Sequence, residues 1–309
     1  MRHWTLWISV LSLGLVLGAP PAAAQPVISP TENVDFDRPE AWAMKYFASV
    51  SLLTGFGPPK AREPGSVEVA LEAGWIPHLS EEERTVGFNG TKTEDLNRFP
   101  AFVRPRVIVG LPGKVSFLAG WVPPLEIDGL EANLFALGFE RPLVEREAWG
   151  LGARLYGQIG TIEGDLTCTD SDVRFEPGSE GNPFGCEAPS DDEADLSYAG
   201  FELVGSYELT GDRAPDLHLG LAANWHDQEF QVDALTFGFR DRTLLLADGW
   251  TWSINAGATW PLSDSTRFGV EAFYSPLSVD RPVGGNPQVT TNEQDDLLNA
   301  RVLFGWSIR

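Results

Sequence analysis

Apolar and polar residues alternate strictly along residues 250–260 of this chain. The apolar row consists of Trp250, Trp252, Ile254, Ala256, Ala258 and Trp260, and the residues between them are small or polar. A period of two predicts a β-strand with two unlike faces. The alternation resumes after a polar turn at residues 261–266 and continues to Tyr274. The two runs together predict a β-hairpin.

Two tryptophans mark the ends of the first strand in this hairpin. Trp250 and Trp260 are ten residues apart. At a rise of about 3.3 Å per residue and a strand tilt of about 40°, the two tryptophans stand roughly 25 Å apart along the membrane normal. This is the height of the apolar band between the two aromatic girdles of a membrane-spanning barrel. The spacing therefore favours a transmembrane strand over a soluble hairpin.

The same alternation recurs along most of the 309 residues. It predicts about ten spanning strands, with twelve as the alternative count, at residues 67–75, 102–111, 115–121, 133–139, 149–159, 199–209, 217–226, 250–260, 268–274 and 298–308. The predicted fold class is all-β, a transmembrane antiparallel up-and-down β-barrel over residues 66–309. Residues 227–249 are interpreted as a hairpin that rises beyond the membrane, with its bend at residues 240–242.

Short and long connections alternate along the predicted strands. The short ones lie at residues 112–113, around Pro142, at 210–215 and at 261–266, and most of the others are long. Bacterial barrels place short turns in the periplasm and long loops outside. We therefore expect both ends of the barrel in the periplasm. This orientation brings seven tryptophans close to a membrane interface, as an aromatic girdle requires.

The first 65 residues divide into two predicted segments. Residues 1–24 have the basic start, apolar run and small-residue site of a secretory signal peptide. Residues 25–65 are expected to form a periplasmic segment with a short amphipathic helix at 38–54, because Pro39 and Glu40 suit a helix start and Gly55 a stop. A strand at 41–54 is the alternative. It would make the strand count odd, so the helix is favoured.

Two cysteines and the net charge limit which bonds and partners this protein can have. Cys168 and Cys186 lie in one acidic loop, residues 163–195. In an oxidising compartment they are expected to form a disulfide, worth roughly 3 kcal/mol in the chain-entropy model. A zinc site is the alternative, but the loop contains no histidine and lacks zinc-ligand spacing. The formal charge of −22 argues against nucleic acid as a partner.

Charged residues of both signs fall on the predicted inward faces. The expected lumen-lining residues are Glu68, Glu72, Arg104, Arg106, Arg154, Glu202, Glu208, Glu271 and Arg301. They suit either a charged constriction that selects solutes or a set of ion pairs that fills and stiffens a narrow barrel. The histidines at 78, 218 and 226 are not expected to be catalytic. No cofactor and no metal site is expected.

The signal peptide, the alternating strands and the closing run from Leu298 to Ile308 resemble the outer-membrane β-barrel proteins of Gram-negative bacteria. The chain departs from them by finishing Trp306-Ser307-Ile308-Arg309 instead of on an aromatic residue. The resemblance implies the bacterial outer membrane as location. It implies membrane lipid, lipopolysaccharide and the barrel-assembly machinery as partners.

Two classes of function follow from this sequence. The first is a narrow channel or transporter for a small solute. The second is a structural or surface-interaction barrel whose acidic extracellular loops meet divalent cations, lipopolysaccharide or a partner. An outer-membrane hydrolase ranks third, and the protein is expected not to be an enzyme.

Overall fold

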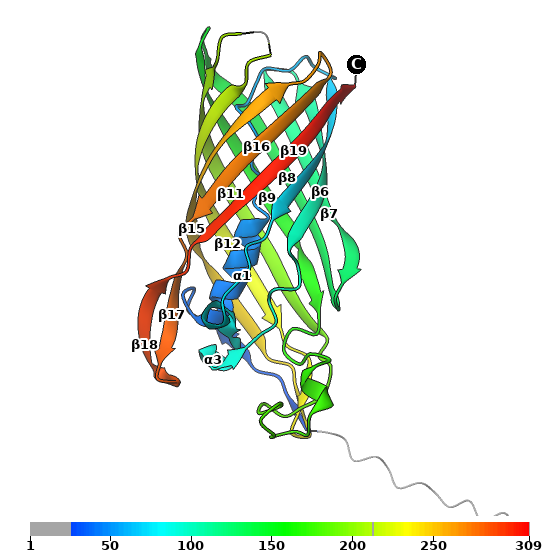
Figure 1. The fold of residues 1–309 in the computed structure, drawn as a ribbon, viewed down its shortest axis with the longest axis vertical. Helices are drawn as coiled ribbons and strands as arrows, with labels where there is room; N and C mark the ends of the chain where they lie inside the picture. The colour runs from blue at the N-terminus through cyan, green and yellow to red at the C-terminus, as the bar shows by residue number, and fades with distance from the viewer. Residues whose placement is uncertain (1–25, 212, 309) are drawn as a thin grey trace, which may run out of the picture.

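A computed structural model describes residues 26–211 and 213–308 of the chain. The predicted signal peptide, residues 1–24, lies outside the described residues. Ten antiparallel strands form a closed barrel (Figure 1), which confirms the predicted fold class and strand count. In chain order they are β3 (Val67–Trp75), β6 (Ala101–Leu111), β7 (Val115–Ile127), β8 (Leu130–Glu145), β9 (Trp149–Gly164), β11 (Asp192–Glu208), β12 (Asp216–Gln231), β15 (Leu244–Pro261), β16 (Thr266–Ser275) and β19 (Leu297–Ile308).

Each barrel strand pairs with its neighbours in chain order, and the last strand closes the ring against the first. The closing ladder runs from Arg301 opposite Gly74 to Ile308 opposite Val67. At one end of the barrel, the short-turn end, the connections are 112–114, 146–148, 209–215 and 262–265. The opposite end, the long-loop end, carries the other connections. One of these is a tight hairpin at 128–129, because β7 continues through residues that the sequence predicted as a loop.

Small elements build up the long-loop end. They are β1 (Val27–Ile28), β2 (Thr31–Asn33), α2 (Glu81–Arg84), β4 (Thr85–Val86), α3 (Gly87–Gly90), β5 (Lys92–Thr93), η1 (Asp172–Arg174), β10 (Cys186–Ala188), β13 (Ala234–Thr236), β14 (Phe239–Asp241), β17 (Ser278–Val283) and β18 (Asn286–Gln294). The predicted hairpin within 227–249 is present as β13 and β14. Its bend lies at Phe237 and Gly238, both with positive φ, and not at the predicted residues 240–242.

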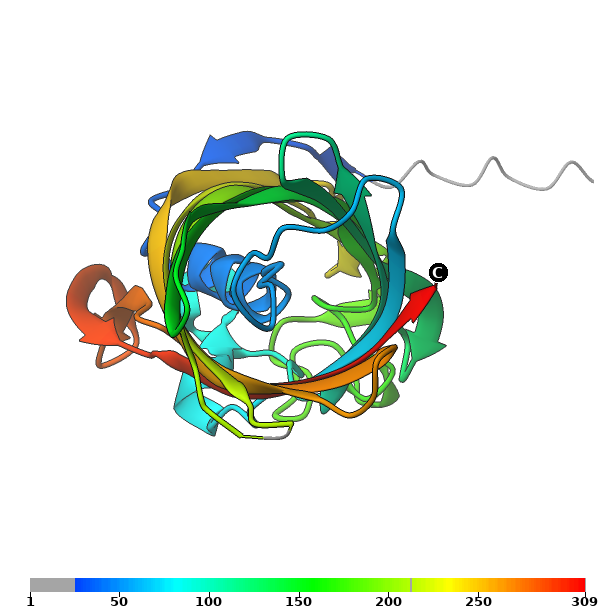
Figure 2. The same ribbon diagram turned by 90° about the horizontal axis from the view of Figure 1, so that it is seen from above.

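Helix α1 (Pro39–Val50) lies inside the barrel, as the view along the axis shows (Figure 2). The helix itself was predicted, but it is buried on nearly every side instead of showing one apolar and one polar face. No helix in the described ranges is long and apolar enough to cross a membrane.

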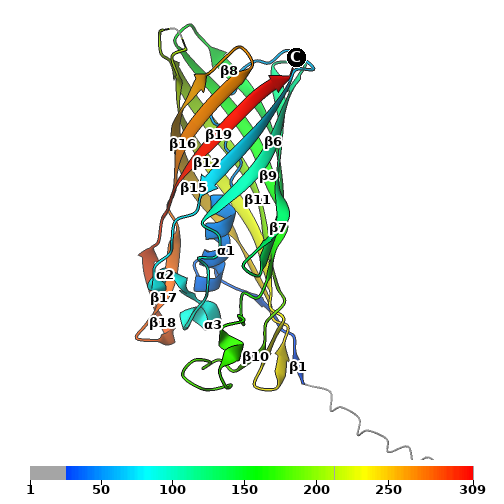
Figure 3. The ribbon, with the colours of Figure 1, turned by 45° about the vertical axis from the view of Figure 1, so that its right-hand side comes forward.

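The expected periplasmic location of the whole segment 25–65 is wrong. Strands β1 and β2 pair with β14 and β15 at the long-loop end. Residues 51–64 then continue to the short-turn end, where Gly65 bonds to Gly110. The segment therefore passes through the full length of the lumen and cannot lie on one side of the membrane (Figure 3). The sequence could not reveal this, because helix propensity says nothing about what surrounds a helix.

The outer and inner faces of the barrel differ as the strand pattern predicts. Large apolar side chains are exposed around the outside, including Leu71, Phe135, Leu137, Leu155, Leu219, Trp252 and Phe304. The inside is apolar toward the long-loop end, where Leu134, Ile162 and Leu196 pack with α1. Toward the short-turn end it is lined by buried charges. A continuous apolar exterior on a closed sheet is the surface that a bilayer covers.

Candidate functional site: a plugged lumen

The lumen is filled by the chain's own residues 39–59, here called the plug. Its first part is α1, whose Trp42 and Tyr46 are buried among the residues of the barrel core. A helix leaves its last four carbonyl groups without partners in the helix, and these carry the negative end of the helix dipole. The structure therefore needs donors at the point where α1 ends, in the middle of the barrel.

Arginines from the barrel wall supply those donors. Arg301 donates to the carbonyls of Val50 at 2.8 Å and Leu52 at 2.6 Å. Arg104 donates to the carbonyl of Ser51 at 2.6 Å. Charge-assisted bonds of this kind are about twice as strong as neutral ones. The end of the helix is thus held by two strands that are widely separated in sequence.

The chain beyond the helix is held in the same way. Arg106 donates to the carbonyl of Thr54 at 2.7 Å, and Arg267 donates to that of Phe56 at 2.9 Å. Phe56 is fully buried and has a φ of 51°, an unusual value for a bulky residue. The carbonyl of Phe56 also accepts from the Thr259 hydroxyl at 2.8 Å. Wall side chains therefore fix the plug as far as the short-turn end.

Each buried arginine also has a carboxylate partner. Glu72 lies 2.8 Å from Arg104 and 3.1 Å from Arg106, while Arg154 pairs with Glu140 at 2.8 Å and with Glu202. Glu271 accepts from Thr54 at 2.5 Å and lies 3.2 Å from His218. Arg301 lies 3.9 Å from Glu72. The buried arginines 104, 106, 154 and 301 are thus equal in number to the buried glutamates 72, 140, 202 and 271. Matched and hydrogen-bonded charges avoid most of the cost of burial without partners.

The structure brings together most of the residues expected to line the lumen. Eight of them are at most 3% exposed: Glu68, Glu72, Arg104, Arg106, Arg154, Glu202, Glu271 and Arg301. Glu208 is different, because its side chain is 51% exposed at the short-turn end, where it pairs with Lys60. Glu68 lies near the same end and pairs with Arg62 and Arg267.

Sequence reasoning missed Glu140, Arg267 and the role of the plug. Glu140 lies on the same strand face as Leu134 and Ala136, so the period of two could have placed it inside. Arg267 lies next to a predicted turn, where strand parity is hard to assign. No signal in the sequence indicates that main-chain carbonyls are the partners of the inward arginines.

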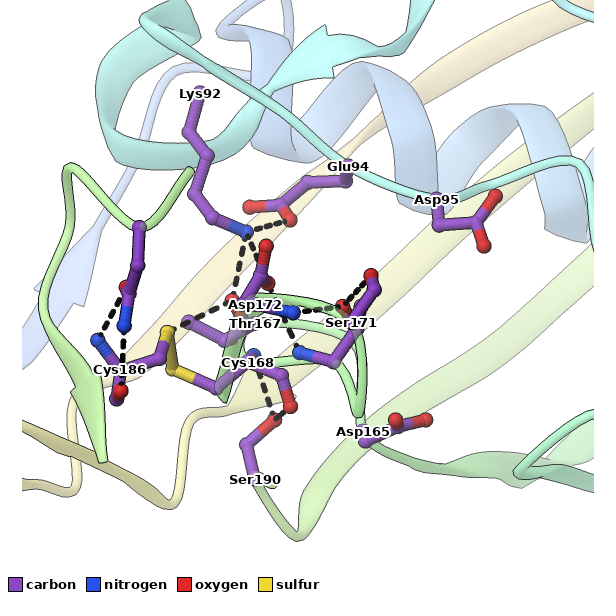
Figure 4. Close-up of polar contacts among 12 residues, drawn as sticks. Lys92, Glu94, Asp95, Asp165, Thr167, Cys168, Ser171, Asp172, Cys186 and Ser190 are labelled. Carbon is purple, nitrogen blue, oxygen red and sulfur yellow. Dashed lines mark hydrogen bonds and ion pairs between the residues drawn. A yellow bond between two sulfur atoms is a disulfide. The ribbon is translucent and has the colours of Figure 1, made fainter. Parts of the chain in front are cut away.

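The acidic loop closes the long-loop end next to the plug. The predicted disulfide between Cys168 and Cys186 is present, with Cα atoms 5.6 Å apart. Lys92, from the loop between β3 and β6, pairs with Glu94 and donates to the carbonyl of Thr167 at 2.7 Å (Figure 4). Burial raises the pKa of Glu94 to about 7, although Lys92 acts in the opposite direction. The two loops are therefore locked together beside the disulfide.

A row of cavities follows the plug. A polar one of about 290 Å³ opens at the short-turn end and ends at Phe56. A polar one of about 210 Å³ lies at the long-loop end, lined by Arg38 and Asp241 among others. Beside α1, an apolar cavity of about 90 Å³ is lined by Met44, Phe47 and Leu196. No cluster of three or more metal-ligating side chains occurs within residues 26–211 and 213–308.

Three features identify the kind of protein: the strands form a closed ring, the exterior is apolar, and the interior is charged and filled. This is a transmembrane β-barrel of the outer-membrane type. Its location is the bacterial outer membrane, where single-chain antiparallel barrels with an even number of strands span the bilayer.

Comparison with known proteins adds no function. No family model and no curated protein matches the chain. Among solved structures, the barrel is similar to the outer membrane protease OmpT from Escherichia coli, at 12% identity and a TM-score of 0.39 over 79% of this chain and 94% of that one. It is similar to an outer membrane channel from Pseudomonas putida F1, at 12% identity and a TM-score of 0.39 over 83% of this chain and 100% of that one. It is also similar to the translocator domain of the autotransporter NalP from Neisseria meningitidis, at 11% identity and a TM-score of 0.40 over 79% of this chain and 89% of that one.

Proposed function

We propose that this protein is a narrow passage for a small solute, closed to ions along the barrel axis by the plug. The observation that carries the proposal is the set of bonds from buried arginines to the plug carbonyls. Side chains alone can fill a barrel of about eight strands. Here a whole segment of chain occupies the lumen, with separate cavities at its two ends. This arrangement suits a controlled passage better than a simple filling.

Single-channel recording in a planar bilayer tests the proposal. The wild-type protein is expected to conduct little or only intermittently. Arg104→Ala/Arg106→Ala removes the donors to Ser51 and Thr54 and leaves Glu72 without its closest partners, so conductance should rise. The control is Arg141→Ala/Arg146→Ala, which changes the charge equally at two exposed positions. A large, steady wild-type conductance that the lumen variant barely changes would refute the plugged passage.

The second candidate is a structural or surface-interaction barrel. The observation that favours it is the ordered layer at the long-loop end, where β1, β14, β13 and β10 form a separate sheet held beside the disulfide. Vesicles containing the protein would then admit no solute, even when the lumen variant opens the barrel. In either case we propose membrane lipid and lipopolysaccharide as the partners of the apolar exterior. We also propose assembly by the barrel machinery and no nucleic-acid partner.

We also propose that the protein is not an enzyme. His218 lies 3.2 Å from Glu271, a pair that could serve as a general base. However, both side chains are buried, and the hydroxyl of Thr54 already donates to Glu271. His226 bonds to Thr251 at 2.8 Å, and His78 lies 3.4 Å from Asn97. The pair of His218 and Glu271 therefore helps to hold the plug through Thr54.

A further inference from the structure

The barrel wall is incomplete between two neighbouring strands. The ladder between β6 and β7 extends from Leu111 opposite Val115 to Arg106 opposite Gly120 and ends there. Residues 101–105 of β6 continue to pair with β3, and residues 121–122 and 125–127 of β7 continue to pair with β8. The two strands therefore separate toward the long-loop end, which leaves a gap in the wall that we call the β6–β7 seam.

Prolines explain why the ladder ends there. Pro105 lies in β6 next to Arg106, and Pro123 and Pro124 lie in the facing part of β7. Proline has no N–H group to donate to a ladder and is confined to strand edges and bulges. The register of β7 with β8 also shifts between Val122 and Leu125. The prolines and the irregular register together remove the pairing that would close the seam.

An apolar cavity of about 180 Å³ lies at this seam. Phe47 and Val50 of the plug line it from the lumen. Val103 and Leu125 also line it, and these are 49% and 62% exposed on the outer, lipid-covered face. The cavity thus borders both the inside of the barrel and the surface that contacts the bilayer.

This seam cavity adjoins the apolar cavity beside α1. The two share the lining residues Phe47, Phe99, Ile162 and Leu196. The cavity beside α1 in turn shares Glu40, Gly87, Glu94, Thr167 and Phe230 with the polar cavity at the long-loop end. A row of adjoining cavities therefore leads from the polar mouth, past α1, to the seam.

The charges that line the cavity beside α1 select against anions. The charged residues lining the cavity beside α1 are Glu40 and Glu94, and each already has a cation: Glu40 pairs with Arg38 at 3.0 Å, and Glu94 pairs with Lys92. Lys92 is further occupied by the carbonyl of Thr167. An anionic ligand would meet carboxylates and no free cation among these lining residues, and burying its charge in apolar surroundings is costly.

We infer that the row of cavities binds a neutral, apolar small molecule, such as a hydrocarbon or an uncharged aromatic compound, and releases it sideways into the membrane through the β6–β7 seam. The inference rests on the proposed function, because it names the class of solute and its exit. It also explains how a barrel closed to ions along its axis could still pass a solute. The plug closes the charged half of the lumen and forms one wall of the apolar route.

The binding test uses ¹⁹F NMR with the full mature protein in lipid nanodiscs. The probes are fluorobenzene and its anionic counterpart 4-fluorobenzoate, with empty nanodiscs subtracted. Fluorobenzene should bind, and 4-fluorobenzoate should bind at least about tenfold more weakly. Ala194→Trp fills the cavity beside α1 and should weaken fluorobenzene binding at least about tenfold. Ala199→Trp, on the exposed face of the same strand, should leave binding unchanged.

A gentler variant guards against misfolding. Ala43→Leu fills part of the same cavity from α1 and should reduce fluorobenzene binding in a barrel that still folds. Equal weakening by Ala199→Trp and Ala194→Trp would overturn the site. Binding of 4-fluorobenzoate as strong as that of fluorobenzene would overturn the ligand class.

The exit is tested by exchange between lipid and cavity. Pro123→Thr/Pro124→Thr restores the missing N–H groups of β7, one of which can face β6, and should slow fluorobenzene exchange several-fold with little change in affinity. Pro142→Thr, in the paired ladder of β8 and β9, is the control. Unchanged exchange in the seam variant would refute the lateral exit. A large wild-type ion conductance would refute the proposed function alone, whereas a closed barrel that binds the anionic probe would refute only this inference.

Discussion

Arg301 offers the sharpest test of how the plug is held. Its guanidinium bonds to Leu52 and Val50, lies 3.9 Å from Glu72 and stacks on Phe273 with 4.5 Å between charge and ring centre. Arg301→Met keeps an apolar stem of similar length and removes only the charged group. The carbonyls of Val50 and Leu52 then stay buried without these donors, and the lumen keeps one carboxylate in excess.

The expected loss of stability follows from these bonds. Each hydrogen bond to a charged group contributes about 1.5 to 3 kcal/mol, so losing the two short bonds to Leu52 and Val50 should lower the free energy of unfolding by about 3 to 6 kcal/mol. Urea unfolding of the refolded protein in detergent measures this change through the shift of the midpoint. The matched control is Arg174→Met in the exposed 3₁₀ turn, which should change the free energy by less than about 0.5 kcal/mol.

Hydrogen exchange separates a loosened plug from a weakened barrel. In Arg301→Met, amides of residues 49–57 should lose protection at urea concentrations where β8, β9 and β11 keep theirs. A loss of less than about 1 kcal/mol, or equal loss of protection in the plug and in those strands, would refute the view that arginines hold the plug.

Three further predictions concern the two ends of the barrel. Protease added to intact cells should cut within residues 163–195 or 276–296 and spare 210–215; cutting confined to 210–215 would invert the orientation. Cys168→Ser/Cys186→Ser should make the acidic loop more sensitive to protease, because the disulfide is worth about 3 kcal/mol in the chain-entropy model, while the thermal midpoint of the barrel should change little; unchanged sensitivity would contradict this. The pKa of Glu94 is 4.5 in an ordinary, solvated carboxyl group and about 7 in the folded protein. Below pH 4.5 the carboxyl group is protonated in both the folded and the unfolded protein, so its pKa shift costs no stability there. As pH rises from about 4.5 to about 7, the unfolded protein loses this proton first, and the folded protein becomes less stable relative to it. Hydrogen exchange of residues 87–98 should therefore slow as pH falls from about 7 to about 5, after correction for intrinsic rates, and Glu94→Gln should abolish this dependence.

Strand parity was the most informative feature of the sequence. In a barrel, one face of each strand meets lipid and the other meets the lumen, so the period of two assigned Glu72, Arg104 and Arg301 to the inside. The same regularity gave the count of ten strands. The tight bend at Phe237 and Gly238 escaped prediction, because Phe is an unusual residue at positive φ and the charged run at 240–242 looked more like a turn.

The contents of the lumen could not be predicted in the same way. A helix inside a barrel and a helix beside it have similar local sequences, and the deciding contacts join residues such as Val50 and Arg301, which are 251 positions apart. The seam had a visible signal in Pro105, Pro123 and Pro124, but its meaning depends on knowing that these stretches of β6 and β7 face each other.

The path of the plug through the barrel also constrains the order in which the protein assembles. Strand β19 is the last to be synthesised, and it closes the ring against β3. Residues 26–33 pair at one end of the barrel while β3 begins at the other, so the ring either closes around the plug or must later be threaded by it. Arg301 belongs to the closing strand and bonds to the plug. The step that seals the barrel is thus the step that completes the grip on the plug, and a ring that closed empty would leave this arginine without its carbonyl partners.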